Sequence, residues 1–198
     1  MLSSITPLGE RGRGNRWALP ATAYVAASVA GGSLLGAVLG SVGVGVRHLA
    51  HPSSVVLWSS LAAVCLLAAI GELRPRLRFP TTRRQVNEDW LDGYRGWVYG
   101  VGFGFQLGMG VVTIVTSVAV FAMAAIAVLS GSIAGGIIIG ATFGLIRALP
   151  ITAFAGVHDQ ASLHRRHRRL QAWAPRARVV AACLLGAVAV VAMLAATL

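Results

Sequence analysis

Five apolar runs, separated by short polar or basic segments, dominate the chain. They cover residues 18–46, 54–71, 97–129, 131–155 and 179–198. A helix needs about 20 apolar residues to cross a hydrocarbon core about 30 Å thick, so four of the runs predict one transmembrane helix each. At 1.5 Å per residue the run 97–129 would make a helix of about 50 Å, which is too long for one span. We therefore predict an all-α integral membrane protein with about five transmembrane helices, the third of them long and either broken or partly re-entrant.

The arginines predict how these helices cross the membrane. Cytoplasmic segments of membrane proteins carry an excess of basic residues. With five spans, the arginines of residues 11–16, 74–95 and 147–178 gather on one side, and only Arg47 lies on the other. Splitting the run 97–129 into two spans would move the cluster at 165–178 to the outside, which the same rule disfavours. We predict a multi-pass protein of a bacterial plasma (inner) membrane, with its N-terminus in the cytoplasm and its C-terminus outside.

The topology divides the chain into four segments. Residues 1–17 are a cytoplasmic N-terminal tail, 18–72 a first helical repeat of two spans, and 73–96 a cytoplasmic link. Residues 97–198 are a second helical repeat of three spans, which includes the basic cytoplasmic loop 158–178. That loop is either a connector or a basic helix on anionic lipid.

Composition narrows the class of protein. Of the residues 56% are hydrophobic and 12% are charged, whereas soluble domains have roughly a quarter charged. The 17 basic residues outnumber the 6 acidic ones, but they stand between apolar runs, so membrane topology explains them without nucleic acid. We expect the lipid bilayer, and no nucleic acid, as a partner.

Two apolar runs contain an internal repeat. Residues 30–40 and 134–144 are identical at six of eleven positions and carry glycines four apart. Glycines spaced in this way let helices approach closely. The predicted packing glycines, including a third stripe on the run 97–129, are Gly32, Gly36, Gly40, Gly100, Gly104, Gly136, Gly140 and Gly144. In five-span topology the two copies are antiparallel, and inverted repeats of this kind are frequent in secondary transporters.

Two motifs resemble a known family. The heptapeptide from Gly102 to Gly108 (GFGFQLG), followed after an apolar stretch by AGG from Ala134 and GLIRALP ending at Pro150, resembles the second half of the CcdA/DsbD transmembrane family. The resemblance covers about residues 96–198. It implies a bundle of two inverted three-helix halves, here without the first helix, and a family activity of carrying thiol reducing equivalents across the bacterial membrane.

The chain departs from that family where its chemistry is carried out. The family uses one Cys in each half, beside a Pro, and the second of these positions falls near Val111 or Val112. Thiol–disulfide exchange needs a thiolate nucleophile, and neither position supplies one. The resemblance therefore implies a shared fold without the shared reaction.

Polar residues in the long third run are candidates for a solute or ion path. They lie among glycines, where a helix can open and expose backbone carbonyls to a water-lined cavity. The candidate path residues are Gln106, Gly108, Gly110, Thr113, Thr116 and Ser117. The alternative is that these side chains form hydrogen bonds with neighbouring helices and serve packing alone.

Other candidates for chemistry are few. Cys65 and Cys183 each lie within a span, and they are either packed as small hydrophobic residues or form a transmembrane thiol pair. Arg147 either contacts an anion or lipid headgroup or extends to the interface. His48 and His51 are three residues apart, but no Cys, Asp or Glu accompanies them as a further metal ligand. The sequence also contains no phosphate loop or catalytic motif, so we expect no metal, no cofactor and no enzymatic activity.

These observations give three hypotheses of function. The first is a transporter-like or permease-like subunit that moves a small solute or ion. The second is a non-transporting membrane scaffold or assembly subunit, and the third is thiol–disulfide electron transfer through Cys65 and Cys183. Because five helices rarely enclose a path alone, we expect a homodimer or a partner membrane subunit.

Overall fold

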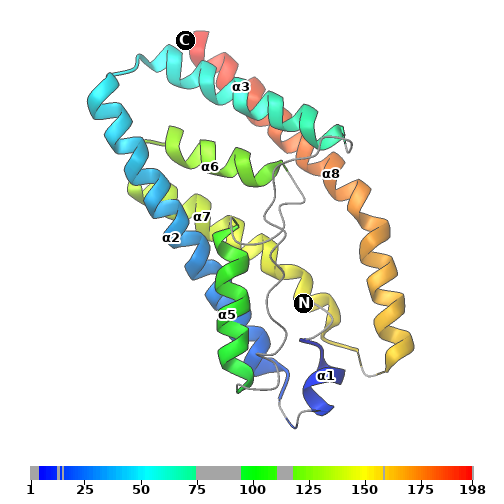
Figure 1. The fold of residues 1–198 in the computed structure, drawn as a ribbon. Helices are drawn as coiled ribbons and strands as arrows, with labels where there is room; N and C mark the ends of the chain where they lie inside the picture. Colours follow the sequence, from blue (N-terminus) through cyan, green and yellow to red (C-terminus); the bar gives the residue numbers. More distant parts are fainter. Residues whose placement is uncertain are drawn as a thin grey trace. The chain divides into compact units, whose positions relative to one another are not determined.

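The computed structural model describes residues 5–12, 14, 16–74, 95–110, 118–157 and 159–197. These residues form helices and no strand (Figure 1). The elements in chain order are α1 (Pro7–Gly12), α2 (Ala18–Ala50), α3 (Ser54–Leu73), α5 (Gly96–Met109), α6 (Ala119–Leu129), α7 (Ile133–Ala148), the 3₁₀ helix η1 (Leu149–Phe154) and α8 (Gln160–Thr197).

Four helical segments are long and apolar enough to cross a membrane. Within the described part of the chain they are Ala18–Ala50, Ser54–Leu73, Ile133–Phe154 and Gln160–Thr197, and α6 is a shorter apolar helix. This confirms the prediction of an all-α, multi-pass membrane protein. Helices α2 and α3 begin and end close to the predicted runs, because long runs of Ala, Val, Leu and Ile leave few polar residues at which a buried helix could end.

The long third run is broken, as its length predicted. Helix α5 ends at Met109, and α6 begins at Ala119. Gly110 follows α5 with a φ of 65°, and its backbone N–H donates to the carbonyl oxygen of Leu107. Glycine adopts this left-handed conformation without steric cost and is therefore the usual residue after a helix end. Residues 111–117 lie outside the described part of the chain.

The basic segment before the last span is part of a helix. Helix α8 continues from Gln160 to Thr197 with Pro175 inside it, so most of the predicted loop 158–178 is helical and continuous with the last apolar run. Asp159 begins this helix, since its carboxylate accepts a hydrogen bond of 2.6 Å from the backbone N–H of Ser162. Proline removes one backbone hydrogen bond from a helix, but the Ala, Leu, Gln and Arg residues before Pro175 favour helix.

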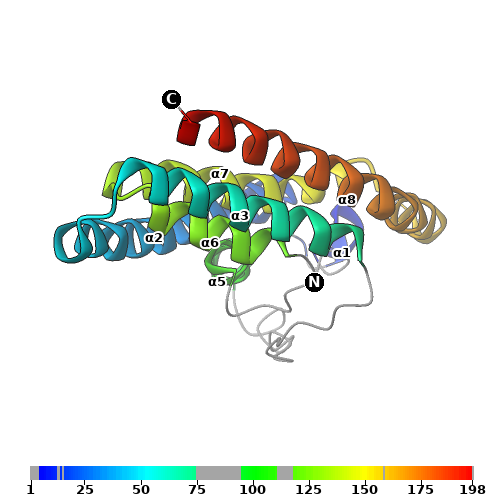
Figure 2. The same ribbon diagram turned by 90° about the horizontal axis from the view of Figure 1, so that it is seen from above.

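Contacts within the chain define two compact units. Unit 1 comprises residues 1–34, 82–114 and 140–172, and unit 2 comprises residues 35–81, 115–139 and 173–198. In unit 1 the buried core consists of Ile5, Ala21, Tyr24, Tyr99, Phe103, Ala148 and Ile151. In unit 2 helices α3 and α6 pack side by side (Figure 2).

Candidate functional site

Helix α5 packs directly against the backbone of α2 in unit 1. Gly100, Gly104 and Gly108 lie on the side of α5 that faces α2. A Cβ atom at Gly104 would lie 2.8 Å from the carbonyl carbon of Tyr24, and one at Gly108 would lie 2.8 Å from the carbonyl carbon of Ser28. Any larger residue would overlap these atoms, so the glycine spacing allows two helix backbones to touch.

Ser28 is the point in unit 1 where three helices meet. Its side chain is fully buried, and its hydroxyl donates a hydrogen bond of 2.8 Å to the carbonyl oxygen of Gly144 on α7. Its own backbone lies against Gly108 of α5 and Gly144 of α7. Because a buried hydroxyl needs a partner, this hydrogen bond joins α2 to α7 at the position where both glycines allow close approach. Sequence reasoning missed this role, because a single Ser in an apolar run does not indicate its partner.

The two copies of the internal repeat pack against each other. In unit 1, Gly32 of α2 lies against Gly140 of α7. In unit 2, Gly136 of α7 lies against Gly36 of α2, and Gly40 lies against the backbone at Ser132 and Ile133. Each step of four residues forward along α2 is matched by a step of four backward along α7, so the copies are antiparallel within each unit. Gly32 in the first copy corresponds to Gly136 in the second, and Gly36 corresponds to Gly140. The contact of Gly32 with Gly140 and the contact of Gly136 with Gly36 therefore join equivalent positions of the two copies.

Of the predicted path residues that the structure describes, Gln106 and Gly108 lie on different faces of α5. Gln106 is two residues from both Gly104 and Gly108, which places it on the opposite side of α5 at 100° per residue. Gly108 is buried against α2, whereas Gln106 is half-buried. Gly110 lies beyond the end of α5. Thr113, Thr116 and Ser117 lie outside the described residues.

Arg147, in the last turn of α7, lies beside the end of α5 within unit 1. Its guanidinium carbon lies 5.3 Å from the centre of the Phe143 ring, and a Cβ atom at Gly110 would lie 3.4 Å from its Nη1. The carbonyl end of a helix carries partial negative charge, which favours a cation beside it. Arg147 is therefore placed to stabilise the end of α5 where the third run breaks.

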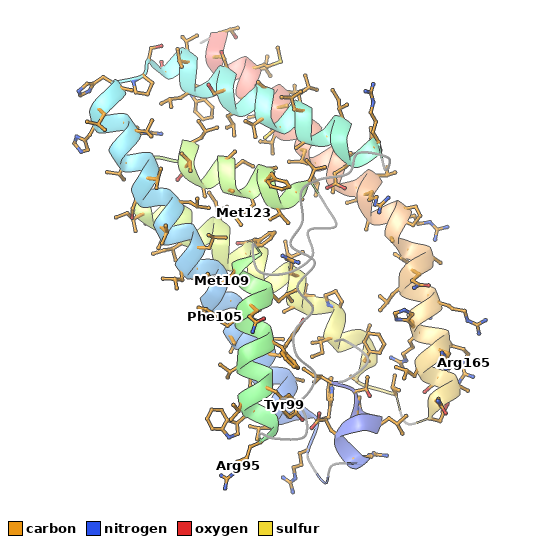
Figure 3. The ribbon with its side chains drawn as sticks, in the orientation of Figure 1. Arg95, Tyr99, Phe105, Met109, Met123 and Arg165 are labelled. Carbon is orange, nitrogen blue, oxygen red and sulfur yellow. The ribbon has the colours of Figure 1, made fainter. Side chains whose placement is uncertain are left out.

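A buried carboxylate joins the N-terminal segment to α5. The Tyr99 hydroxyl lies 2.5 Å from each carboxylate oxygen of Glu10, and both side chains are fully buried. Figure 3 shows Tyr99 on α5 beside α1. The Trp17 indole also donates to the carbonyl oxygen of Ile5, at 3.2 Å. Part of the segment 1–17, which was predicted as a tail, is thus packed into unit 1 through Ile5, Glu10 and Trp17.

A local signal could have identified α1 in the sequence. Thr6 precedes Pro7, and the Thr6 hydroxyl accepts a hydrogen bond of 3.2 Å from the backbone N–H of Gly9. Threonine at the cap followed by proline at the first helical position is a known helix start.

Helix α6 is held at both ends by charged side chains of unit 2. The backbone N–H of Ala119 donates to the Glu72 carboxylate at 3.0 Å, and Glu72 is buried. At the other end Arg47 Nη2 donates to the carbonyl oxygens of Leu129, at 3.1 Å, and Ser130, at 3.0 Å. A carboxylate at the start of a helix and a guanidinium at its end both complement the helix dipole. The sequence did not reveal either contact, because the partners of Glu72 and Arg47 lie far away in the chain.

The cysteines differ in environment. Cys65 is buried in α3, Cys183 is exposed on α8, and both are free thiols. Among the described residues no group of three His, Cys, Asp or Glu side chains could hold a metal ion.

Comparison with known proteins gives three relatives, each named methylamine utilization protein MauF. The relative from Methylophilus methylotrophus is 30% identical over 88% of this chain, that from Paracoccus denitrificans 33% over 94%, and that from Paracoccus versutus 34% over 75%. The chain spans 59%, 66% and 56% of these relatives, respectively. No family model and no solved structure matches the chain.

These comparisons correct the family resemblance inferred from the sequence. The CcdA/DsbD resemblance was wrong, because the relatives found are MauF proteins and no CcdA/DsbD family model matches. It rested on short Gly- and Phe-rich motifs. The structure gives those motifs a different explanation: Gly104, Gly108 and Gly144 are required by backbone contact between helices, and any membrane protein with similarly close helices can contain them.

Proposed function

We propose that this chain is a non-transporting membrane accessory subunit that holds or helps to assemble partner proteins used in methylamine utilization. The observation that carries the proposal is the similarity over 94% of the chain to the Paracoccus denitrificans relative, whose name states that process. The chain spans 66% of that relative, so the process and the partners belong to the proposal.

The packing of α5 supports a scaffold over a permease. A water-lined path needs side chains or backbone groups that face an open space. The Gly108 face of α5 lies instead against the backbone of α2 at Ser28, and the Ser28 hydroxyl is used in a hydrogen bond with Gly144. Such close contact favours a rigid bundle, because separating these helices would leave buried polar groups without partners.

The proposal includes location and partners. The arginine distribution supports insertion in a bacterial inner membrane with the N-terminus in the cytoplasm. Several apolar side chains of α8, such as Val180, Leu184 and Val191, are more than half exposed. They offer a surface to lipid, to a second copy or to a partner membrane subunit. The proposed role requires no enzymatic step and no cofactor.

A gene deletion with two readouts tests the proposal. In the organism that encodes this chain, we expect deletion to abolish growth on methylamine while the initial uptake of labelled methylamine stays at the wild-type rate. Complementation with the intact gene should restore growth. Loss of uptake in the deletion strain, or accumulation of labelled methylamine by proteoliposomes that contain the purified chain, would instead support a permease.

The same strain distinguishes thiol electron transfer from assembly. We expect a chain with both Cys65→Ser and Cys183→Ser to restore growth on methylamine as well as the wild type does. Failure of this variant to restore growth, at an unchanged amount of protein in the membrane, would support a redox role for the thiols.

A further inference from the structure

Unit 2 contains an open groove that none of the roles above uses. Its volume is about 430 Å³, and it lies between the end of α2, the first turns of α3 and the end of α6. Cavities of about 300–1,000 Å³ are the size that holds small molecules or parts of larger ones. Its lining residues are Arg47, Ser54, Leu57, Trp58, Leu61, Ile126, Leu129 and Ser130.

The lining is amphipathic along its length. On α3, Ser54 is the first residue, and Leu57 and Leu61 follow on the same face one and two turns further along. On α6, Ser130 lies just beyond the last turn, and Ile126 lies one turn back. The start of α3 and the end of α6 therefore place the polar groups together with Arg47, and the apolar side chains extend away from them.

Arg47 supplies the positive charge of the groove. Its two hydrogen bonds with the end of α6 use a single nitrogen, Nη2. A guanidinium carries five N–H donors, so the group can hold α6 and still offer donors to an anion. Among the described residues that line the groove none is acidic, and the first turn of α3 adds the partial positive charge of a helix start.

We propose that this groove binds a phospholipid with an anionic headgroup. The phosphate would be held by Arg47 with the hydroxyl of Ser54, and an acyl chain would lie along Leu57, Leu61 and Ile126. Trp58, which is 40% exposed, is a side chain that favours the headgroup level of a bilayer. A cation at one end and an apolar wall extending from it complement an anionic lipid, because free phosphate would contact only the cationic end and make no contact with the apolar wall.

Lipid retention by the purified full chain tests this proposal. The protein in detergent would be mixed with phosphatidylglycerol or with phosphatidylcholine of the same acyl chains, and bound lipid would be counted by native mass spectrometry. We expect the wild type to retain phosphatidylglycerol about fivefold more than phosphatidylcholine, the factor expected for one Arg beside a headgroup of net negative charge, because the choline cation neutralises the phosphate of phosphatidylcholine.

Three variants separate the headgroup from the acyl chain. Arg47→Gln should make retention of the two lipids equal, and Leu61→Trp, which fills the groove and keeps Arg47, should lower retention of both. Arg168→Gln, on the exposed side of α8, is the matched charge control and should behave as the wild type. If Arg47→Gln destabilises α6 and fails to fold, Leu61→Trp still carries the test.

Four results of the lipid measurements would overturn the proposal. They are equal retention of both lipids by the wild type, an unchanged preference in Arg47→Gln, an equal loss of preference in Arg168→Gln, and no effect of Leu61→Trp. Binding of inorganic phosphate alone that depends on Arg47 would also overturn it, since the apolar wall would then contribute nothing.

Discussion

Replacing Gly108 by alanine tests whether backbone contact between α5 and α2 holds unit 1 together. The substitution adds one methyl group, and in most helices this stabilises the helix by up to about 1 kcal/mol because alanine restricts the unfolded chain. Here the new Cβ atom would lie 2.8 Å from the backbone nitrogen of Gly32 and equally near the carbonyl carbon of Ser28. Both atoms belong to the α2 backbone, so no side chain can rotate away to make room.

The expected size of the effect follows from this geometry. Ordinary van der Waals contact begins near 3.4 Å, and the carbonyl oxygen of Ser28 would lie even closer to the new Cβ atom than these two atoms do. Helices α5 and α2 must therefore move apart by more than about 0.6 Å at this point. Moving them also strains the hydrogen bond between Ser28 and Gly144, because Ser28 lies between both helices. Overpacking of this kind costs typically about 1–3 kcal/mol. After the gain in helix propensity, we expect Gly108→Ala to lower the free energy of unfolding by about 1–2 kcal/mol.

Two glycines in open positions provide controls. Gly45 and Gly186 also lie inside helices, and a Cβ atom at either would meet nothing within 4 Å. Gly45→Ala and Gly186→Ala should therefore leave stability unchanged or raise it by up to about 1 kcal/mol. The measurement is the Tm of the purified protein in detergent, followed by tryptophan fluorescence. A Tm for Gly108→Ala at or above that of the two controls would refute the inference that α5 and α2 touch through this glycine.

Three further predictions concern charged and polar groups. We expect Glu72→Ala to lower the free energy of unfolding by about 1–3 kcal/mol, since the N–H of Ala119 loses its acceptor. Glu72→Gln keeps an acceptor oxygen and should lower it by only about 0.3–1 kcal/mol. Equal Tm values for the two variants would contradict this prediction. Tyr99→Phe should lower the free energy of unfolding by about 1–3 kcal/mol. The double variant with Glu10→Gln should lose less stability than the sum of the two single variants. Additive losses would mean that the contact between Tyr99 and Glu10 contributes nothing to stability. The backbone N–H of Ser162 lowers the pKa of Asp159, as does Arg165 to a smaller extent, so this cap stabilises α8 above the ordinary pKa of about 4 and loses its effect as pH falls through the lowered pKa. In the wild type, amide hydrogen exchange in the first turn of α8 should therefore become faster in acid than its intrinsic pH dependence predicts. The variant Asp159→Asn should not show this change. Identical pH profiles for the two proteins would exclude the carboxylate as the cause.

Hydropathy alone was enough to predict the apolar helices, for a physical reason. A backbone in lipid must satisfy its own hydrogen bonds, so apolar runs such as those of α2 and α3 can form only helices. The break in the third run followed from its length, but its position at Gly110 did not, since that run contains several glycines. The continuity of the basic segment with the last apolar run in one helix was not predicted. Proline usually ends a helix, but Pro175 lies inside α8.

The contacts made by polar side chains could not be predicted from the sequence. Glycines four apart indicate a packing face, but they do not indicate that Gly108 faces Ser28 or that Gly136 faces Gly36. Glu10 and Tyr99 are 89 positions apart, and such a distance leaves no local pattern. Glu72 lies next to a basic link in the sequence, so a surface position was the natural expectation. Partners this far apart become visible only when the helices have been placed.

The way in which α6 is held has a consequence for biosynthesis. With 11 residues, α6 is about 16 Å long, roughly half of the hydrocarbon core, and it is too short to insert stably as an independent span. Glu72 and Arg47, which bind its two ends, both precede it in the chain. Since chains are synthesised from the N-terminus, the docking site for α6 is already complete when α6 leaves the ribosome. The order of these residues thus lets the first two spans act as a template for the incomplete third, and moving the segment 119–129 ahead of α2 in a permuted gene would remove that advantage.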